Sequence, residues 1–199
     1  METPTKRDLI LDALQNLLEN ADIHHISVNS IAQRAGIGKG SIYYYFSSKD
    51  EILNALIKRT YAGALEMAKE LVHQTHLSIY VRLAKITNAC IAATGDFLKR
   101  SQAVKNNMET AERIYDSAYM HQQFMKHSIV DFKEVYTQII QQEIDKGNIW
   151  FNSAAELAEI VLIVFTVKVD NSLSPSTTEE TIKTLQTLIT LLERGTGNE

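Results

Sequence analysis

The stretch SVNSIAQRAGIGKGSIYYYFSSKDEIL, residues 27–53, decides the fold. It predicts two short helices, the first over 28–34 after the N-cap residue Ser27 and the second over about 38–45. Gly36 lies between them and supplies the left-handed backbone that a tight turn needs. The positions expected to face a core are apolar, small or, in one case, aromatic: Ile31, Ala32, Ala35, Ile37, Ile42 and Tyr45. This spacing fits a helix-turn-helix, although other short helical hairpins share it.

The outward face of the second short helix carries no acidic residue and can therefore lie against a polyanion. Its residues are Gly38, Lys39, Gly40, Ser41, Tyr43, Tyr44 and Ser47. The whole stretch closely resembles the signature of the TetR family of one-component bacterial regulators. The matching elements are Ile31-Ala32, Ala35-Gly36-Ile37, Lys39-Gly40-Ser41-Ile42-Tyr43, Tyr45-Phe46 and Lys49.

The resemblance implies a homodimer whose N-terminal heads each place a recognition helix in the major groove of double-stranded DNA. It implies a repressor of a palindromic operator, with a small-molecule effector that binds the C-terminal part and moves the heads. Carried over residue by residue, Ser27 would bond a phosphate, Lys39, Tyr43, Tyr44 and Lys49 would hold the DNA backbone, and Asn29, Gly40, Ser41 and Tyr45 would approach base edges or phosphates.

Two departures from the family pattern stand out. Gly38 replaces the usual Ser, which removes a hydroxyl that would cap the recognition helix or bond a phosphate. Ala21-Asp22-Ile23 replaces the usual Gly and aromatic residue, so the end of the first helix is less defined. The recognition helix also has one cation, Lys39, and no Arg to pair with guanine. Specificity should therefore depend on Asn29 or Gln33, on tyrosine rings against thymine methyls and on DNA shape.

The rest of the chain predicts long helices. Only 8 Gly and 2 Pro occur in 199 residues, which is too few turns for a sheet protein. A first helix is expected after Thr5, with its stop at Asn20 to Asp22. Further helices are expected over about 48–73, 78–99, 121–146, 153–170 and 177–194, with irregular or short helical structure over 101–119. Thr5 with Asp8 and Ser48 with Glu51 predict capping boxes. The expected architecture is all-α, with a three-helix head over 1–48 and a helical effector-binding and dimerisation bundle over 49–199.

The last two predicted helices, 153–170 and 177–194, are the expected dimer surface. Residues 157–167 are apolar almost all round the helix, so every side must be covered. Ile182, Leu185, Leu188, Ile189 and Leu192 form an apolar stripe on the following helix. A partner subunit would cover both, while the alternative is a central helix buried within one subunit.

The middle helices carry large apolar and sulfur-containing side chains that adapt to varied ligand shapes. We expect an apolar or aromatic effector to contact some of Tyr80, Cys90, Tyr115, Met120 and Phe124. Taken alone, each of these residues is more typical of an ordinary core. A highly charged ligand would need a cationic cluster, and only Arg82 and Lys85 lie nearby.

Composition excludes several other classes. The net charge of −4 lies outside the head, because residues 1–59 hold seven Lys or Arg and seven Asp or Glu. The single cysteine, Cys90, excludes an internal disulfide and multi-cysteine zinc sites, and the pair His73 and His76 is a weak metal candidate. Without a membrane span or a signal-peptide core, we expect a cytoplasmic protein that does not associate with membranes.

No catalytic constellation or phosphate-cradling loop is present in the sequence, so we expect no enzyme, no cofactor and no metal. Two other classes remain open. One is a protein-binding adapter or coactivator that uses the helical head without an operator of its own. The other is a helical enzyme that metabolises its ligand, which turnover of a bound compound would reveal.

Overall fold

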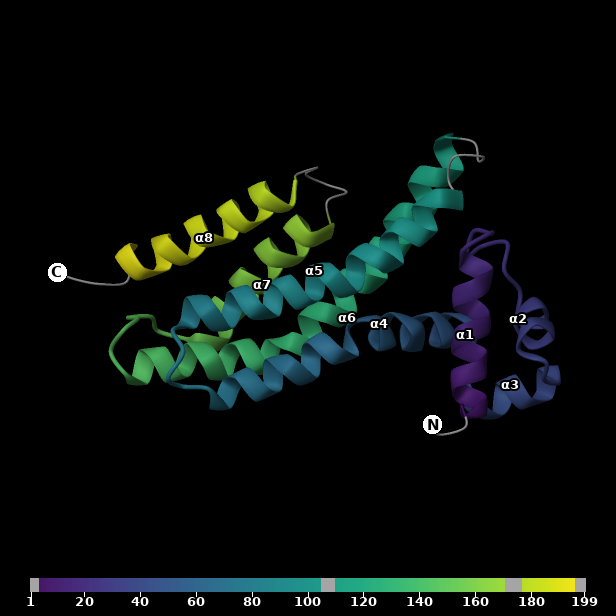
Figure 1. Cartoon of the computed structure of the whole chain (residues 1–199), viewed down its shortest axis with the longest axis horizontal. Coiled ribbons are helices and arrows are strands. Elements are labelled where there is room, and N and C mark those ends of the chain that lie inside the picture. The colour runs from purple at the N-terminus through teal and green to yellow at the C-terminus, as the bar shows by residue number, and fades with distance from the viewer. Residues whose placement is uncertain (1–3, 105–109, 171–176, 196–199) are drawn as a thin grey trace. The chain divides into compact units, whose positions relative to one another are not determined.

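The computed structural model describes residues 4–104, 110–170 and 177–195 (Figure 1). Within these ranges every regular element is a helix, which confirms the all-α prediction. The helices are α1 (Lys6–Leu18), α2 (Val28–Ala35), α3 (Lys39–Tyr45), α4 (Lys49–His73), α5 (Ile79–Val104), α6 (Thr110–Asp145), α7 (Ala154–Asp170) and α8 (Thr178–Gly195). No helix in the described ranges has the length and apolar character needed to cross a membrane.

The helix starts follow the capping residues in the sequence. At α1, the Asp8 N–H donates to Thr5 Oγ1 at 3.2 Å and the Asp8 carboxylate accepts from the Thr5 N–H at 3.1 Å, as predicted. At α4, the Glu51 N–H donates to Ser48 Oγ at 3.1 Å. The Glu51 carboxylate, however, accepts from the N–H and hydroxyl of Ser47, at 2.6 and 2.7 Å, because Ser47 offers two donors. The predicted box at Ser48 is therefore only half formed.

The prediction of irregular structure over 101–119 is wrong for the residues that the structure describes. Helix α5 continues to Val104 and α6 begins at Thr110. Residues 101–119 contain neither Gly nor Pro, so nothing in the described parts of this stretch stops a helix. At the other end of α6, Gly147 adopts a left-handed φ of 73° just after the last residue of the helix, Asp145.

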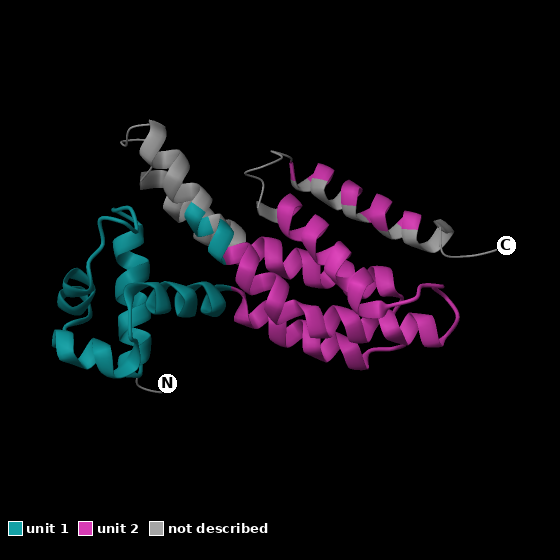
Figure 2. Ribbon diagram, turned by 180° about the vertical axis from the view of Figure 1, so that it is seen from behind, with its two compact units in different colours: residues 1–60, 94–123 teal, residues 61–93, 124–199 magenta. Residues whose placement is uncertain are grey.

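The chain divides into two compact units, which Figure 2 shows in different colours. Unit 1 contains residues 1–60 and 94–123, and unit 2 contains 61–93 and 124–199. Helices α4, α5 and α6 each have residues in both units. The predicted domain boundary after residue 48 coincides with the start of α4, and the units divide that helix further along.

The core of unit 1 is mostly aliphatic. Helix α1 packs against α2, and α2 packs against α3. The fully buried side chains include Ile10, Leu11, Leu14, Ile31, Ile42, Ile52, Leu53 and Leu56. Of the predicted helix-turn-helix core, Ile31, Ala32 and Ile42 are buried, whereas Ala35, Ile37 and Tyr45 are half-buried. Burial of this apolar surface is the main term that stabilises so small a head.

Unit 2 contains an aromatic cluster, which we define as Tyr61, Phe124, Phe132, Tyr136 and Phe165. Successive ring centroids lie 5.5 to 6.5 Å apart, within the range of favourable aromatic pairs. The rings come from α4, α6 and α7. They therefore link three helices that are far apart in the sequence.

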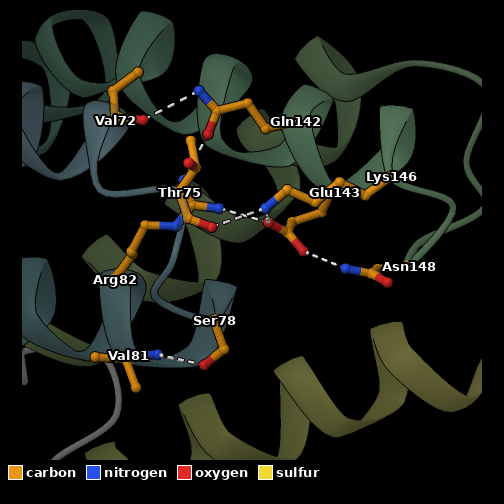
Figure 3. Close-up of polar contacts among 9 residues, drawn as sticks. All are labelled: Val72, Thr75, Ser78, Val81, Arg82, Gln142, Glu143, Lys146 and Asn148. Atoms are coloured by element: carbon orange, nitrogen blue, oxygen red, sulfur yellow. Dashed lines mark hydrogen bonds and ion pairs between the residues drawn. The ribbon is translucent and has the colours of Figure 1, made fainter.

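A buried ion pair joins α5 to α6 within unit 2 (Figure 3). The side chain of Arg82 is fully buried and donates to Gln142 Oε1 at 2.6 Å and to Glu143 Oε1 at 2.7 Å. Glu143 also accepts from Lys146 Nζ at 2.7 Å and from Asn148 Nδ2 at 2.8 Å. A buried carboxylate is tolerated only with such partners.

The same network reaches the turn that follows α4. Gln142 Nε2 donates to the Val72 carbonyl at 3.1 Å, and Lys146 Nζ donates to the Thr75 carbonyl at 3.2 Å. The α4–α5 turn, the first turns of α5 and the end of α6 are thereby connected through side chains (Figure 3).

Opposing effects act on the pKa of Glu143. Burial alone would raise this pKa, but the hydrogen bonds from Lys146 and Asn148 and the charges of Lys146 and Arg82 lower it below 4.5. The ionised form is therefore the one that the fold stabilises. This stabilisation is present above pH 4.5 and is lost as the pH falls through the lowered pKa.

Replacement of Arg82 by Met should lower the free energy of unfolding by about 3 kcal/mol at pH 7, because Glu143 then keeps a buried charge without its fully buried partner. Urea denaturation at fixed protein concentration measures this loss. The difference from wild type should shrink as the pH falls through the lowered pKa of Glu143, where its carboxylate becomes protonated.

Lys133→Met is the matched control, because Lys133 forms an exposed ion pair with Glu159. This substitution should cost less than about 1 kcal/mol. Equal losses for the Arg82 and Lys133 variants would show that the buried network contributes no more than a surface pair.

Candidate nucleic-acid interface

The start of α2 is held by a capping box at Ser27 and Ser30. The Ser30 N–H donates to Ser27 Oγ at 3.0 Å, and the Ser27 N–H donates to Ser30 Oγ at 3.0 Å. Ser27 nevertheless remains exposed. The predicted phosphate-contacting residue is therefore rigidly placed at the N-terminus of α2.

Gly36 ends α2 and turns the chain into α3. Its φ of 68° and ψ of 28° are left-handed, as predicted from the sequence. The Gly36 N–H donates to the Gln33 carbonyl at 3.2 Å, and the Ile37 N–H donates to the Ala32 carbonyl at 3.1 Å. A residue with a Cβ would be strained at this φ.

The structure places the predicted DNA-contacting residues of α2 and α3 on accessible surface. The exposed ones are Asn29, Gln33, Gly38, Lys39, Gly40, Tyr43 and Tyr44, and the half-buried ones are Ser41 and Tyr45. Tyr44 is 82% exposed, and its ring meets that of Tyr45 edge-on at 5.0 Å between centroids. An apolar ring so exposed suits contact with a partner rather than with the core.

Gly38 is the N-cap of α3, and no side chain caps this helix. A Cβ at Gly38 would meet nothing within 4 Å. The space that a serine side chain would occupy in the family pattern is therefore open in this chain.

Lys49 has an intramolecular role that the sequence did not predict. Its Nζ donates to the Ile23 carbonyl at 2.6 Å and to the Ile26 carbonyl at 2.9 Å, and its side chain is half-buried. The ammonium thus joins the start of α4 to the loop that precedes α2. Two of its three donors are occupied, which leaves little of Lys49 for a phosphate.

The same loop departs from the family pattern and is closed in another way. Asp22 is buried, and its carboxylate accepts the His24 N–H at 2.7 Å, so the loop turns without the usual Gly. The His24 ring also lies 5.6 Å from that of Tyr119 in α6, whose hydroxyl donates to Asp50 at 3.1 Å. Burial and this hydrogen bond raise the pKa of Tyr119, which therefore stays a donor.

Three of the five predicted effector contacts lie in unit 2. Phe124 meets Tyr61 of the aromatic cluster at 5.5 Å, Cys90 is buried, and Tyr80 is half-buried. Burial raises the pKa of the Cys90 thiol to about 12, so it is an inert apolar group. Met120 belongs to unit 1, and the side chain of Tyr115 lies outside the described residues.

Sequence reasoning missed the polar centre of the aromatic cluster. The Tyr61 hydroxyl donates to Asp131 Oδ2 at 2.6 Å, and burial, followed by this bond, raises the pKa of Tyr61. Tyr136 is fully buried, which also raises its pKa. Arg82, the nearby cation considered in the sequence, is occupied by Glu143. Helical periodicity indicates only that a position is buried, so it did not predict these hydrogen bonds and ion pairs.

The sequence comparisons match the N-terminal part of the chain. Residues 10–56 match the family model described as bacterial regulatory proteins, tetR family. The fatty acid metabolism regulator protein of Bacillus subtilis is 34% identical over 61 residues, 31% of each chain. The transcriptional regulator EthR of Mycobacterium tuberculosis is 42% identical over 50 residues, which are 25% of this chain and 23% of EthR. The matched stretch spans a third or less of these relatives.

Solved structures match nearly the whole chain at low identity, which shows the fold. A protein from Syntrophomonas wolfei described as a TetR-family transcriptional regulator has a TM-score of 0.67 at 19% identity, covering 96% of this chain and 95% of its own. FadR from Bacillus subtilis, solved with stearoyl-CoA, has a TM-score of 0.63 at 20% identity, covering 95% and 98%. Residues 10–56 therefore carry the helix-turn-helix of the tetR-family model, and the chain as a whole has the fold of solved TetR-family regulators.

Proposed function

We propose that this protein is a DNA-binding transcriptional regulator, a repressor that binds a palindromic operator as a homodimer and responds to a small apolar or aromatic effector. The observation that carries the proposal is the α2–α3 pair. Its turn is set by Gly36, its exposed face runs from Asn29 to Tyr44, and residues 27–49 include no acidic side chain. Such a face suits the major groove of a duplex.

Within this face we assign phosphate contacts to Ser27, Lys39, Tyr43 and Tyr44, and base or base-adjacent contacts to Asn29, Gln33, Gly40, Ser41 and Tyr45. Lys49 is assigned to holding the loop before α2, because its ammonium is already bonded to two carbonyls. Phosphate contacts position the protein, and the second group would specify sequence.

We assign the dimer surface to α7 and α8. Ile160 and Ile163 on α7 are 49% and 45% exposed, and Leu191 on α8 is 63% exposed. The opposite face of α7 is buried, so these side chains project from a helix whose own-subunit packing is already satisfied. A second copy of the same surface would remove them from water.

The effector is assigned to the helices around the aromatic cluster. The names of two relatives refer to fatty acid metabolism and to stearoyl-CoA, a ligand with a long apolar chain. In this chain the buried cation Arg82 is neutralised by Glu143, which disfavours a ligand recognised mainly by its negative charge. An apolar moiety is therefore the part of the effector that these residues would recognise.

Binding-site selection from a random duplex library with the full-length protein tests DNA binding. Lys39→Ala and Tyr43→Ala should each weaken binding about tenfold on every sequence, because each loses a phosphate contact. Only Lys39→Ala should also reduce the salt dependence, because only Lys39 carries a charge. Asn29→Ala should instead relax one position of the consensus by about 1–3 kcal/mol.

Lys69→Ala is the control for charge, because Lys69 is an exposed cation of unit 2 paired with Glu66. It should leave both affinity and consensus unchanged. If no duplex is retained by the wild-type protein, the DNA-binding proposal fails and a protein-binding adapter is favoured.

The double variant Ile163→Glu and Leu191→Glu should be monomeric in light scattering at concentrations where the wild type is a dimer. The two carboxylates would be buried without partners at the proposed interface. Val130→Glu is the matched control, because Val130 is 68% exposed but lies on α6. A double variant that remains dimeric would exclude this surface.

Titration of operator-bound protein with stearic acid, stearoyl-CoA and coenzyme A tests the effector assignment. The two probes with an acyl chain should change DNA affinity, and Phe124→Ala should reduce that response at least threefold because it removes an apolar contact. Val130→Ala changes an exposed residue of the same helix, α6, and should leave the response unchanged. A response to coenzyme A alone, with none to stearic acid, would contradict an apolar effector site.

A further inference from the structure

Three of the seven Lys and Arg side chains in residues 1–59 are bonded within the head. Arg59 pairs with Asp12 at 2.8 Å and also donates to Gln15. Arg34 donates to Asn16 at 3.3 Å, and Lys49 donates to two backbone carbonyls. The recognition helix itself contributes only Lys39. DNA binding that draws on so few cations needs a further phosphate contact.

Arg7 stands next to the recognition helix. It is exposed in the first turn of α1, and its guanidinium carbon lies 5.3 Å from the centre of the Phe46 ring. Phe46 is the C-cap of α3, is 3% exposed and donates its N–H to the Ile42 carbonyl at 2.9 Å. The buried ring is therefore a fixed platform, and the cation–π contact holds Arg7 at the C-terminal end of α3.

The carboxylates near Arg7 are already hydrogen-bonded. Asp8 accepts from the Thr5 hydroxyl at 2.6 Å and from its N–H, and Glu51 accepts from the hydroxyl and N–H of Ser47. These bonds are the main reason that the pKa values of both carboxyls are lowered, while the charge of Arg7 adds a smaller effect. The guanidinium of Arg7 lies over the Phe46 ring, and a cation–π contact leaves N–H groups of the guanidinium for an anion.

We propose that Arg7 is a further DNA contact of this protein, which binds a backbone phosphate beside the end of the recognition helix. The inference rests on the proposed DNA-binding function. In this assignment Arg7 supplies the backbone contact that Lys49 gives up to the loop. The stacking on Phe46 fixes where the phosphate lies relative to α3, so Arg7 positions the helix as well as adding charge.

Arg7→Gln tests the proposal. The affinity of the full-length protein for a labelled 30-base-pair duplex from the selection would be measured by fluorescence anisotropy at several salt concentrations. Affinity should fall at least fivefold. The slope of log K against log salt should shrink by about 0.9 for each head bound, or about 1.8 for a dimer. A mere loss of stability would leave this slope unchanged.

Lys6→Gln is the matched control. Lys6 is an exposed cation directly before Arg7 in the first turn of α1, and its substitution removes the same charge. It should leave the slope nearly unchanged. Arg7→Lys should restore the slope but only part of the affinity, because an ammonium keeps the charge but lacks the planar set of N–H donors that pairs with a phosphate.

Equal slopes for Arg7→Gln and the wild type, or equal losses for the Arg7 and Lys6 variants, would overturn the assignment of Arg7. That outcome differs from failure of the proposed function, in which the wild-type protein would bind none of the duplexes. A sequence preference altered by Arg7→Gln would also contradict a backbone contact.

Discussion

The geometry of the head depends on one backbone angle, the φ of 68° at Gly36. Gly36 ends α2, and the chain changes direction within two residues because the Ile37 N–H donates to the Ala32 carbonyl. Everything on α3 follows from this turn. Ile42 enters the core, whereas Tyr43 and Tyr44 of the same helix remain exposed. The surface that we assign to DNA is therefore a consequence of where α2 stops.

The loop before α2 is held from several sides. Asp22 closes the turn locally, Lys49 holds two of its carbonyls from the start of α4, and the His24 ring meets Tyr119 of α6. None of these contacts needs the Gly and aromatic residue of the family pattern. A buried carboxylate and a half-buried ammonium give the loop its shape instead, by bonding to backbone groups that have no partner in a helix.

Several cationic side chains of this protein form bonds within the fold. In the head, Arg59 and Lys49 bond to side chains and carbonyls of the same unit, which leaves few cations for a polyanion. In unit 2, Arg82 is committed to Glu143 and to Gln142. The proposed DNA interface therefore relies on a small number of well-placed contacts and on the proposed dimer, and the proposed effector site relies on apolar surface and the Tyr61 hydroxyl.

The sequence by itself determined the helical class, the helix-turn-helix and the left-handed Gly36, because these depend on local periodicity, capping and backbone sterics. It also determined which face of α3 lacks acidic residues. Only the tertiary structure decided that Lys49 bonds to Ile23 and Ile26, that Arg82 is buried against Glu143, and that Arg7 stacks on Phe46. These partners are between 23 and 61 residues apart in the sequence. A charged side chain interacts with the partners that the fold places close to it, and a local sequence pattern does not show which distant residues these are.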